Sequence, residues 1–261
     1  MAWCGARAAA GALAFALALL SGDGRASAAD LQVMATGASK ALVQALGELF
    51  QAQTGHRIVL VTDTAGGVQR RIQSGEAADV VVATPVVIDA LIQSGRIANG
   101  SRLDLARTGI GVGVAEGAAM PDISSVDAVK RLIVAARGIA YVDPAGGGTS
   151  GIYFVQMVER LGLAEVLRAR AKPKMGGYAA ELVASGEADV VFHQISEIMP
   201  VRGVRLVGPL PAELQLVTTY AAGLAANPRE AGAARAFIWL MNSPAAEPAI
   251  RAAHMEPVAG R

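Results

Sequence analysis

Residues 139–154 read IAYVDPAGGGTSGIYF, and this stretch decides the fold that we expect. Its apolar start predicts a buried strand, the glycine and hydroxyl residues predict a loop, and the residues from Gly151 onward predict a helix. The first turn of a helix has backbone N–H groups without intrahelical partners and carries the positive end of the helix dipole. Strand, small-residue loop and helix in this order therefore predict a place where an anion can bind.

The same order recurs along the chain. Strands are expected at residues 31–34, 57–61 and 79–82, each followed by a loop of small or hydroxyl residues and then a helix. This alternation predicts mostly parallel sheets flanked by helices. Strand-rich segments near 108–114 and 208–217 are suited to crossing between two lobes, with the loops at the strand ends facing the cleft.

We therefore expect an α/β chain with two lobes, each a mostly parallel sheet flanked by helices, hinged by two crossover strands. The expected first lobe contains residues 29–110 and 212–261, and the expected second lobe contains residues 111–211. A cleft between such lobes is a usual place for a small ligand.

The first 28 residues predict a secretory signal peptide. Arg7 precedes an apolar run at residues 8–20, and Ala26-Ser27-Ala28 fits a cleavage site of small residues. The apolar run is short for a membrane span, although an uncleaved anchor is the alternative. We expect a periplasmic location, a monomer and no stable membrane insertion.

Composition excludes several classes of function. Hydrophobic residues make up 53% of the chain and charged residues 17%, which is typical of a globular protein. Removing residues 1–28 takes away two arginines and one aspartate, leaving 21 basic and 21 acidic residues and no basic stripe for nucleic acid. The single cysteine, Cys4, lies in the signal segment, so no internal disulfide is expected. No cluster of His, Cys or carboxylate has the spacing of metal ligands, and we expect no cofactor.

An ordered set of segments resembles the molybdate-binding-protein-like branch of type II periplasmic solute-binding proteins. The resemblance is carried by residues 33–39, 63–72, 75–82, Asp143-Pro144 with 151–153, and 186–192, and it covers nearly the whole chain after the signal segment. It implies a hinged, two-lobed protein that binds a small anion and delivers it to the permease of an ABC importer.

The chain departs from the molybdate pattern at three places. The first-loop serine position holds Ala38, with Ser39 one place later, and the second loop reads Thr64-Ala65-Gly66 in place of a serine run. The later tyrosine position falls at or beside Gln194. These changes resemble the divergent subgroup that handles carboxylates, which includes periplasmic aconitate isomerases, and they favour a carboxylate over molybdate.

The candidate ligand-binding residues follow from these loops and from the strand that ends at His193. Hydroxyl and amide donors of the loops would hold anionic oxygens, and Arg107, with its planar guanidinium, would bind a carboxylate. The full set is Thr36, Gly37, Ala38, Ser39, Thr64, Ala65, Gly66, Thr84, Arg107, Thr149, Ser150, Gly151, His193 and Gln194. The hydroxyl residues and glycines also have a plain structural explanation, because Ser and Thr routinely cap helices and glycines form turns. Arg107 could equally be a solvated surface residue, and His193 a core or rim histidine with its own partners.

Three functions remain open at this point. The leading hypothesis is the substrate-binding component of an ABC importer for a small anion. The alternative is a periplasmic isomerase of a tricarboxylate such as aconitate, in which His193 would be the base that moves a proton. A sensor that binds ligand without transport cannot be separated from these by sequence.

Overall fold

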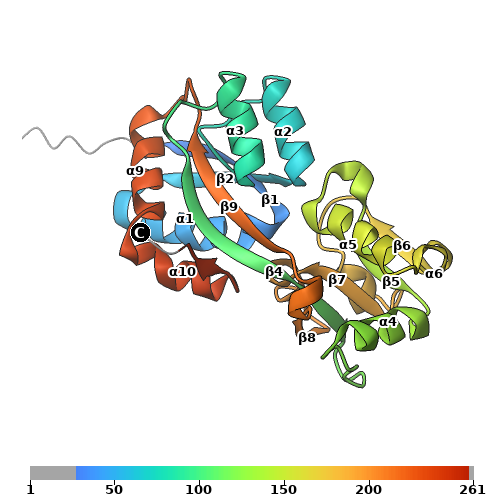
Figure 1. Ribbon diagram of the computed structural model, residues 1–261. Helices are drawn as coiled ribbons and strands as arrows, with labels where there is room; N and C mark the ends of the chain where they lie inside the picture. Colours follow the sequence, from blue (N-terminus) through green and yellow to red (C-terminus); the bar gives the residue numbers. More distant parts are fainter. Residues whose placement is uncertain (1–27, 259–261) are drawn as a thin grey trace, which may run out of the picture.

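The computed structural model describes residues 28–258, and its ribbon has two lobes joined by long strands (Figure 1). One of these strands, β4 (Leu103–Ala115), changes its partner halfway along. At Gly109 it still pairs with β9 (Val217–Leu224), and from Ile110 it pairs with β7 (Val190–Gln194). The second connection returns from β8 (Val204–Pro209) through a short helix, η3 (Ala212–Leu214), into β9. The predicted two-lobed α/β architecture with two crossovers is confirmed.

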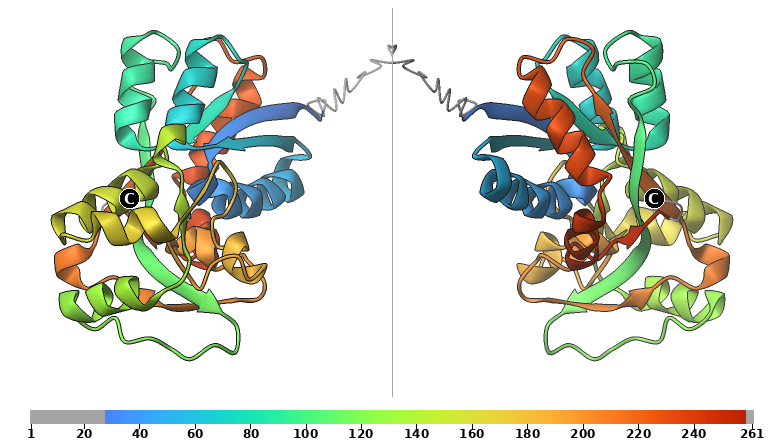
Figure 2. Two further views of the ribbon diagram at one scale, coloured as in Figure 1. Left: turned by 90° about the vertical axis from the view of Figure 1, so that its right-hand side faces the viewer. Right: turned by 90° about the vertical axis from the view of Figure 1, so that its left-hand side faces the viewer.

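The first lobe has a mixed sheet in the order β2, β1, β3, β9, β4. Strands β2 (Arg57–Asp63), β1 (Asp30–Thr36) and β3 (Val80–Ala83) are parallel, and β9 runs antiparallel to β3. Helices α2 (Ala65–Gln73) and α3 (Pro85–Gln93) cover one face. The other face carries η1 (Gly37–Ser39), α1 (Lys40–Thr54), α9 (Ala231–Met241), η4 (Pro244–Ala246) and α10 (Glu247–Ala252). The two views in Figure 2 show these two helical layers. The short strand β10 (Glu256–Pro257) pairs with β4.

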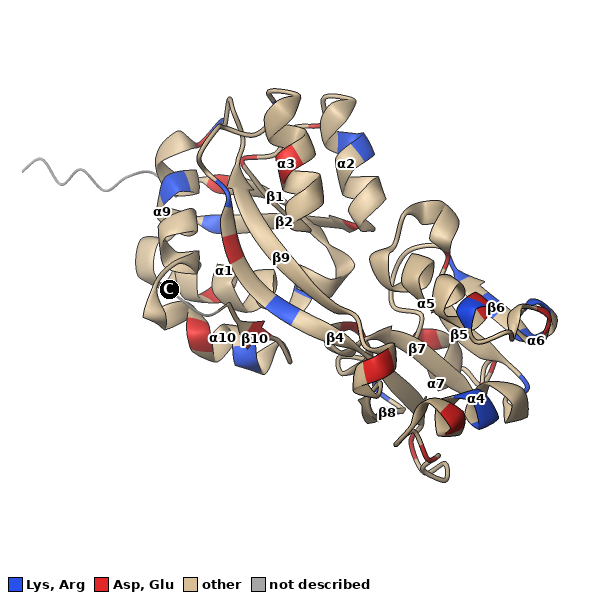
Figure 3. Ribbon diagram, viewed as in Figure 1, with Lys and Arg blue, Asp and Glu red and all other residues tan. Residues whose placement is uncertain are grey.

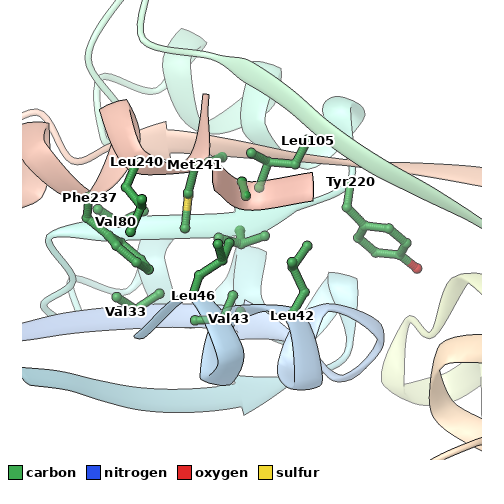
Figure 4. Packing of buried hydrophobic residues seen from close by; sticks show 14 of the residues in the cluster. Val33, Leu42, Val43, Leu46, Val80, Leu105, Tyr220, Phe237, Leu240 and Met241 are labelled. Carbon is green, nitrogen blue, oxygen red and sulfur yellow. The ribbon is translucent and has the colours of Figure 1, made fainter. Parts of the chain in front are cut away.

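Alternation along β1 explains why this sheet is covered on both faces. Leu31, Val33 and Ala35 belong to the core under α1 and α9, whereas Met34 belongs to the core under α2 and α3. A strand buried on both faces reads as a continuous apolar run, as Val33-Met34-Ala35 does within β1. Figure 4 shows the first of these cores, with Tyr220 at its edge and the tyrosine hydroxyl pointing away from the apolar cluster.

The second lobe repeats the plan with a smaller sheet. β5 (Ile139–Val142) lies parallel to β6 (Ala171–Lys174) and β7, while β4 pairs antiparallel with both β7 and β8. Helices α4 (Val126–Ala135), α5 (Thr149–Arg160) and α6 (Ala164–Arg170) pack on one face, and α7 (Glu181–Ala184) and α8 (Ile195–Ile198) on the other. Phe154 of α5 stacks on Phe192 of β7 with ring centroids 4.6 Å apart.

The stretch at residues 139–154 folds in the predicted order. Strand β5 is followed by the short helix η2 (Pro144–Gly146), and α5 begins at Thr149, two residues earlier than the sequence indicated. The helix comes very close to the strand, because a Cβ on Gly151 would lie 1.8 Å from the Val142 carbonyl oxygen. Only glycine allows this approach, so Gly151 is a packing residue.

The predicted signal peptide at 1–28 lies almost entirely outside the described residues. Within the part of the chain that the structure describes, no helix is long and apolar enough to cross a membrane.

In each lobe an aspartate follows a Gly-Glu-Ala segment, and the two aspartates differ in their burial. Asp79 is 1% exposed, and its carboxylate accepts hydrogen bonds from the backbone N–H of Gln32 at 2.8 Å, Arg229 at 2.6 Å and Glu230 at 3.2 Å. It therefore ties β1 and the start of α9 to the end of the loop before β3. In the second lobe, Asp189 accepts from the backbone N–H and the guanidinium of Arg137, but its side chain is 33% exposed.

We expect Asp79→Ala to lower the free energy of unfolding by about 3 kcal/mol or more, because buried N–H groups lose a charged acceptor. The matched variant Asp189→Ala should cost roughly 1 kcal/mol, since water can replace an acceptor that is partly exposed. Urea unfolding followed by circular dichroism measures both. Equal losses for the two variants would contradict this assignment.

Candidate ligand-binding site

A cavity of about 270 Å³ lies between the lobes and is lined by residues of both. From the first lobe it takes Thr36, Gly37, Ala38, Lys40, Thr62, Asp63, Thr64, Ala65 and Tyr220. From the second lobe it takes Val142, Gly148, Thr149, Ser150, Gly176, Gly177, Tyr178, Glu181, His193, Gln194 and Glu197. Apart from Tyr220, which lies within β9, these residues lie at or beyond the carboxyl ends of β1, β2, β5, β6 and β7, where ligands of α/β proteins are usually found.

Three long helices begin at this cavity. The first turns leading into α1, α2 and α5 carry the small residues Ala38, Ala65 and Ser150, all of which line it. The positive ends of their helix dipoles therefore point toward the same cavity, and in α2 the Gly66 and Gly67 N–H groups are already hydrogen-bonded to the Gly147 oxygen and to Thr64 Oγ1. Such a site is suited to negative charge without any metal ion or arginine.

The structure brings most of the predicted residues to the cavity. Those that line it are Thr36, Gly37, Ala38, Thr64, Ala65, Thr149, Ser150, His193 and Gln194. Ser39 does not line it; this side chain is fully buried, and its Oγ lies 3.0 Å from the Thr36 Oγ1, so it supports Thr36 from behind.

Four other candidates do not line the cavity. Thr84 is the residue before α3, and Gly151 packs against β5. Gly66 donates its N–H to the Gly147 carbonyl oxygen across the cleft. Arg107 lies in the middle of β4, and its guanidinium forms an ion pair with Glu256 of the neighbouring strand β10 at 2.9 Å, half exposed to solvent. The expected arginine fork at the ligand is therefore not brought to this cavity.

Hydrogen bonds to the backbone oxygens of Gly146 and Gly147 join the lobes on one side of the cavity. The Gly66 N–H donates to the Gly147 oxygen at 3.1 Å, and Arg70 donates to the Gly146 oxygen at 3.2 Å. The Thr64 hydroxyl donates to the same Gly146 oxygen and accepts from the Gly67 N–H. Thr64 thus holds the lobes together, and its hydroxyl is already committed to these two bonds.

Side chains join the lobes on the other side. The Tyr220 hydroxyl of β9 donates to Gln194 Oε1 at the end of β7. The Lys40 Nζ lies 5.5 Å from the centroid of the Tyr178 ring, close enough for a cation–π contact. The cavity is therefore flanked on two sides by contacts between the lobes.

Charges of both signs are scattered over both lobes (Figure 3), but those at the cavity are few. Lys40 is the only Lys or Arg among the residues that line it. Of the lining carboxylates, Asp63 lies 3.5 Å from Arg71 and Glu181 lies 3.2 Å from Lys174, so each has a cation beside it. Burial, with the neighbouring carboxyl groups, raises the pKa of Tyr178 to about 12, which keeps this hydroxyl protonated.

His193 and Glu197 form a buried pair at the wall of the cavity. The Nδ1 atom of His193 lies 3.1 Å from Glu197 Oε2 and 3.4 Å from Ser150 Oγ, and it accepts the Gln194 N–H at 2.8 Å. Burial lowers the pKa of His193 and raises the pKa of Glu197 to about 8, so both groups favour their neutral forms. The pair can hold or pass one proton beside a bound molecule.

Sequence reasoning missed several residues of this site, among them Lys40, Tyr178, Glu197 and Tyr220. Two of them had a local signal, because Lys40 directly follows Ser39 and Glu197 lies in the turn directly after the strand that carries His193. Tyr178 and Tyr220 come from elements far from these loops in the chain, so no local pattern indicated them.

We expect Gly147→Ala to hold the lobes apart. Gly147 has φ +79°, and a Cβ there would lie 2.8 Å from the Gly66 Cα across the cleft. The measurement is the radius of gyration by small-angle X-ray scattering, which should increase relative to the wild type. The control is Gly162→Ala, which has a similar φ of +73° with nothing within 4 Å of the added Cβ, so it carries the same backbone strain without the cleft contact. An unchanged radius for Gly147→Ala would contradict the closing role of this contact.

We expect the protein to lose stability as pH rises from 6.5 to 8. The pKa of Glu197 is raised in the folded state, so between the unfolded and the folded pKa the folded protein holds a proton that the unfolded chain has released. The free energy of unfolding therefore falls as pH rises through this range. His193, whose pKa is lowered, acts in the opposite sense, but most of its effect falls below pH 6.5. The net loss should be about 1 kcal/mol, and Glu197→Gln should remove it. Urea unfolding at the two pH values gives the test; a wild type and a variant with the same pH dependence would contradict it.

Comparison with known proteins identifies the family. A family model described as bacterial extracellular solute-binding protein matches residues 31–256. An aconitate isomerase from a Pseudomonas species is 31% identical over 234 residues, which is 87% of this chain and 88% of that protein.

Solved structures share the fold. The periplasmic molybdate-binding protein of Azotobacter vinelandii superposes with a TM-score of 0.74 at 24% identity, covering 88% of this chain and 100% of that one. A sulfate-binding protein from Mycobacterium tuberculosis gives a TM-score of 0.71 at 16% identity, covering 88% of each chain. With the family model spanning both lobes and the cavity between them, this chain belongs to the bacterial extracellular solute-binding proteins.

Proposed function

We propose that this protein binds a small organic carboxylate anion in the cavity between its lobes and delivers it, in the periplasm, to the permease of an ABC importer. The observation that carries this proposal is the convergence of three helix starts and the hydroxyls of Thr36, Thr149 and Ser150 on one cavity between the lobes. Neutral donors of this kind bind an anion and can also release it.

The shape and lining of the cavity favour a carboxylate over a tetrahedral oxyanion. Its volume of about 270 Å³ is several times the roughly 30 Å³ that one water molecule occupies, so a five-atom oxyanion would fill only part of it. Lys40, His193 and Gln194 add separate polar groups on different walls, which suits a ligand with acceptors at several positions. The 31% identical relative is named for aconitate, a tricarboxylate, and this also supports the choice.

The test is a thermal-shift and calorimetric panel of cis-aconitate, trans-aconitate, citrate, molybdate, tungstate and sulfate. A ligand that binds only the folded state raises the melting temperature in proportion to its affinity. We expect a carboxylate to give the largest shift. Stabilisation by molybdate alone would overturn the carboxylate assignment, and the absence of any shift across the panel would overturn anion binding.

We expect Ser150→Ala to weaken the binding of the best carboxylate about tenfold, because it removes a buried hydroxyl donor to a charged ligand. The matched control is Ser124→Ala, on an exposed loop of the same lobe, which should leave the dissociation constant unchanged. Isothermal titration calorimetry measures both. Equal affinity for Ser150→Ala and the wild type would remove this residue from the site.

Isomerisation is the second candidate function, and two observations favour it. One is the relative named aconitate isomerase, and the other is the buried pair of His193 and Glu197 beside Ser150. An aconitate isomerase must take a proton from one carbon of its substrate and return a proton to another, and this pair has the capacity to exchange one. Incubation with each aconitate isomer in D₂O, followed by NMR, tests it. Interconversion with deuterium uptake, lost in His193→Ala, would establish the enzyme and displace transport as the leading function.

A further inference from the structure

Glu197 is the acidic group of the cavity without a cation beside it. Its side chain is 10% exposed, and among residues 28–258 no Lys or Arg lies within ion-pair distance of its carboxyl group. A Cβ on Gly37 would lie 2.5 Å from Glu197 Oε1, so the carboxyl packs against the first loop of the opposite lobe. An ionised Glu197 would place an unpaired buried charge in a cavity suited to anions, which is costly for the protein and repels the ligand.

The hydrogen bonds around His193 indicate where the proton lies. The Gln194 N–H points at His193 Nδ1 from 2.8 Å, so Nδ1 presents a lone pair. Glu197 Oε2 lies 3.1 Å from the same nitrogen. The single lone pair of Nδ1 can be shared between the Gln194 N–H and the O–H of a protonated Glu197, whereas an ionised carboxylate would face that lone pair with no proton between them.

We propose that Glu197 is a ligand-binding residue that is protonated in the complex, so that the protein holds its anion together with one proton. This inference rests on the anion binding proposed above. Neutral Glu197 adds no repulsion, and its O–H can turn from His193 to an oxygen of the ligand. Burial raises the pKa of Glu197, which agrees with this assignment.

The other titratable groups around Glu197 are accounted for. Lys40 at the start of α1 lines the same cavity from the first lobe, with its Nζ over the Tyr178 ring. Burial raises the pKa of Tyr178 and of Tyr220, so both tyrosines keep their protons. Asp63 and Glu181 have Arg71 and Lys174 beside them. Strand β4 and the short helix η1 pack on α8, and where they do so they contribute only apolar residues, glycines and Ser39. Strand β8 also packs on α8, and its Arg205 donates to the Ala118 carbonyl oxygen. Glu197 is therefore the group that we expect to control the pH dependence of binding.

The consequence is binding that weakens as pH rises. Below the pKa of free Glu197 the site is already protonated and the affinity is flat. Above it, the protein must take up a proton in order to bind, so the dissociation constant should rise about tenfold for each pH unit.

Calorimetric titration with trans-aconitate between pH 6.5 and 9.5 tests this, with molybdate as a second probe whose own charge is constant in that range. The wild type should show the rising dissociation constant, and at pH 9 the heat measured in Bicine and in Tris, two buffers with different ionisation enthalpies, should differ by the uptake of close to one proton per ligand. Glu197→Gln keeps the shape and an N–H donor, so it should bind with an affinity that is flat across this range. Glu181→Gln, which changes a cavity carboxyl that has its own cation, should keep the slope of the wild type.

The outcomes separate this inference from the proposed function. Tight binding by the wild type with no pH dependence and no proton uptake would overturn the role of Glu197 and leave anion binding intact. An unchanged slope in Glu197→Gln would also overturn it. If no anion binds at any pH, the proposed function fails and this inference fails with it. The proton uptake is measured on the wild type, so the test does not depend on the folding of a variant.

Discussion

The structure depends on one constraint, which is that a single strand serves two sheets. β4 pairs with β9 up to Gly109 and with β7 from Ile110. The backbone is continuous through this change of partner, so the two sheets stay joined at β4. The carboxyl ends of the parallel strands in each lobe face the same cleft. Every feature of the cavity follows from this, because loops that follow β1, β2, β5 and β7 in sequence become opposite walls in space. Gly111 and Gly113 of β4 allow neighbouring side chains to pack closely on this strand, since a Cβ at either position would lie within 3.0 Å of them.

The cavity combines many weak donors with few full charges. Hydroxyls and first-turn N–H groups surround it, Lys40 is its one lining cation, and two of its three carboxyl groups have cations of their own. A buried arginine would bind an anion strongly, but its charge would need compensation whenever the ligand left. Dipoles and hydroxyls cost less to leave without a ligand, because water can reach them when the lobes open. This balance suits a protein that must release what it binds, or exchange a substrate for a product.

Local signals allowed the fold and much of the cavity to be predicted from the sequence. The strand, loop and helix at residues 139–154 were predicted to within two residues, because apolar runs, glycines and hydroxyls act over short distances along the chain. Arg107 was placed at the ligand because it is a cation near a crossover, yet its surroundings depend on β10, whose pairing with β4 joins residues about 150 positions apart. Tyr178 and Tyr220 reach the cavity through the same kind of long-range pairing, which a single sequence does not reveal. Glu197 could have been predicted, because it lies in the turn directly after the strand that carries His193.

The two lobes contribute different chemistry, and the difference links protonation to closure. The loops of the first lobe supply mainly neutral donors, whereas β7 and α8 of the second lobe carry the pair His193 and Glu197. The Glu197 carboxyl packs against Gly37 of the first lobe, and Gln194 beside it accepts the Tyr220 hydroxyl from the same side. Closing the lobes therefore removes this carboxyl from water, and a group removed from water resists ionisation. By linkage, whatever ionises Glu197 must also favour opening, and whatever closes the lobes must also favour the proton. In the binding that we propose, ligand, proton and closed lobes are three parts of one equilibrium, because the acid lies at the surface where the lobes meet.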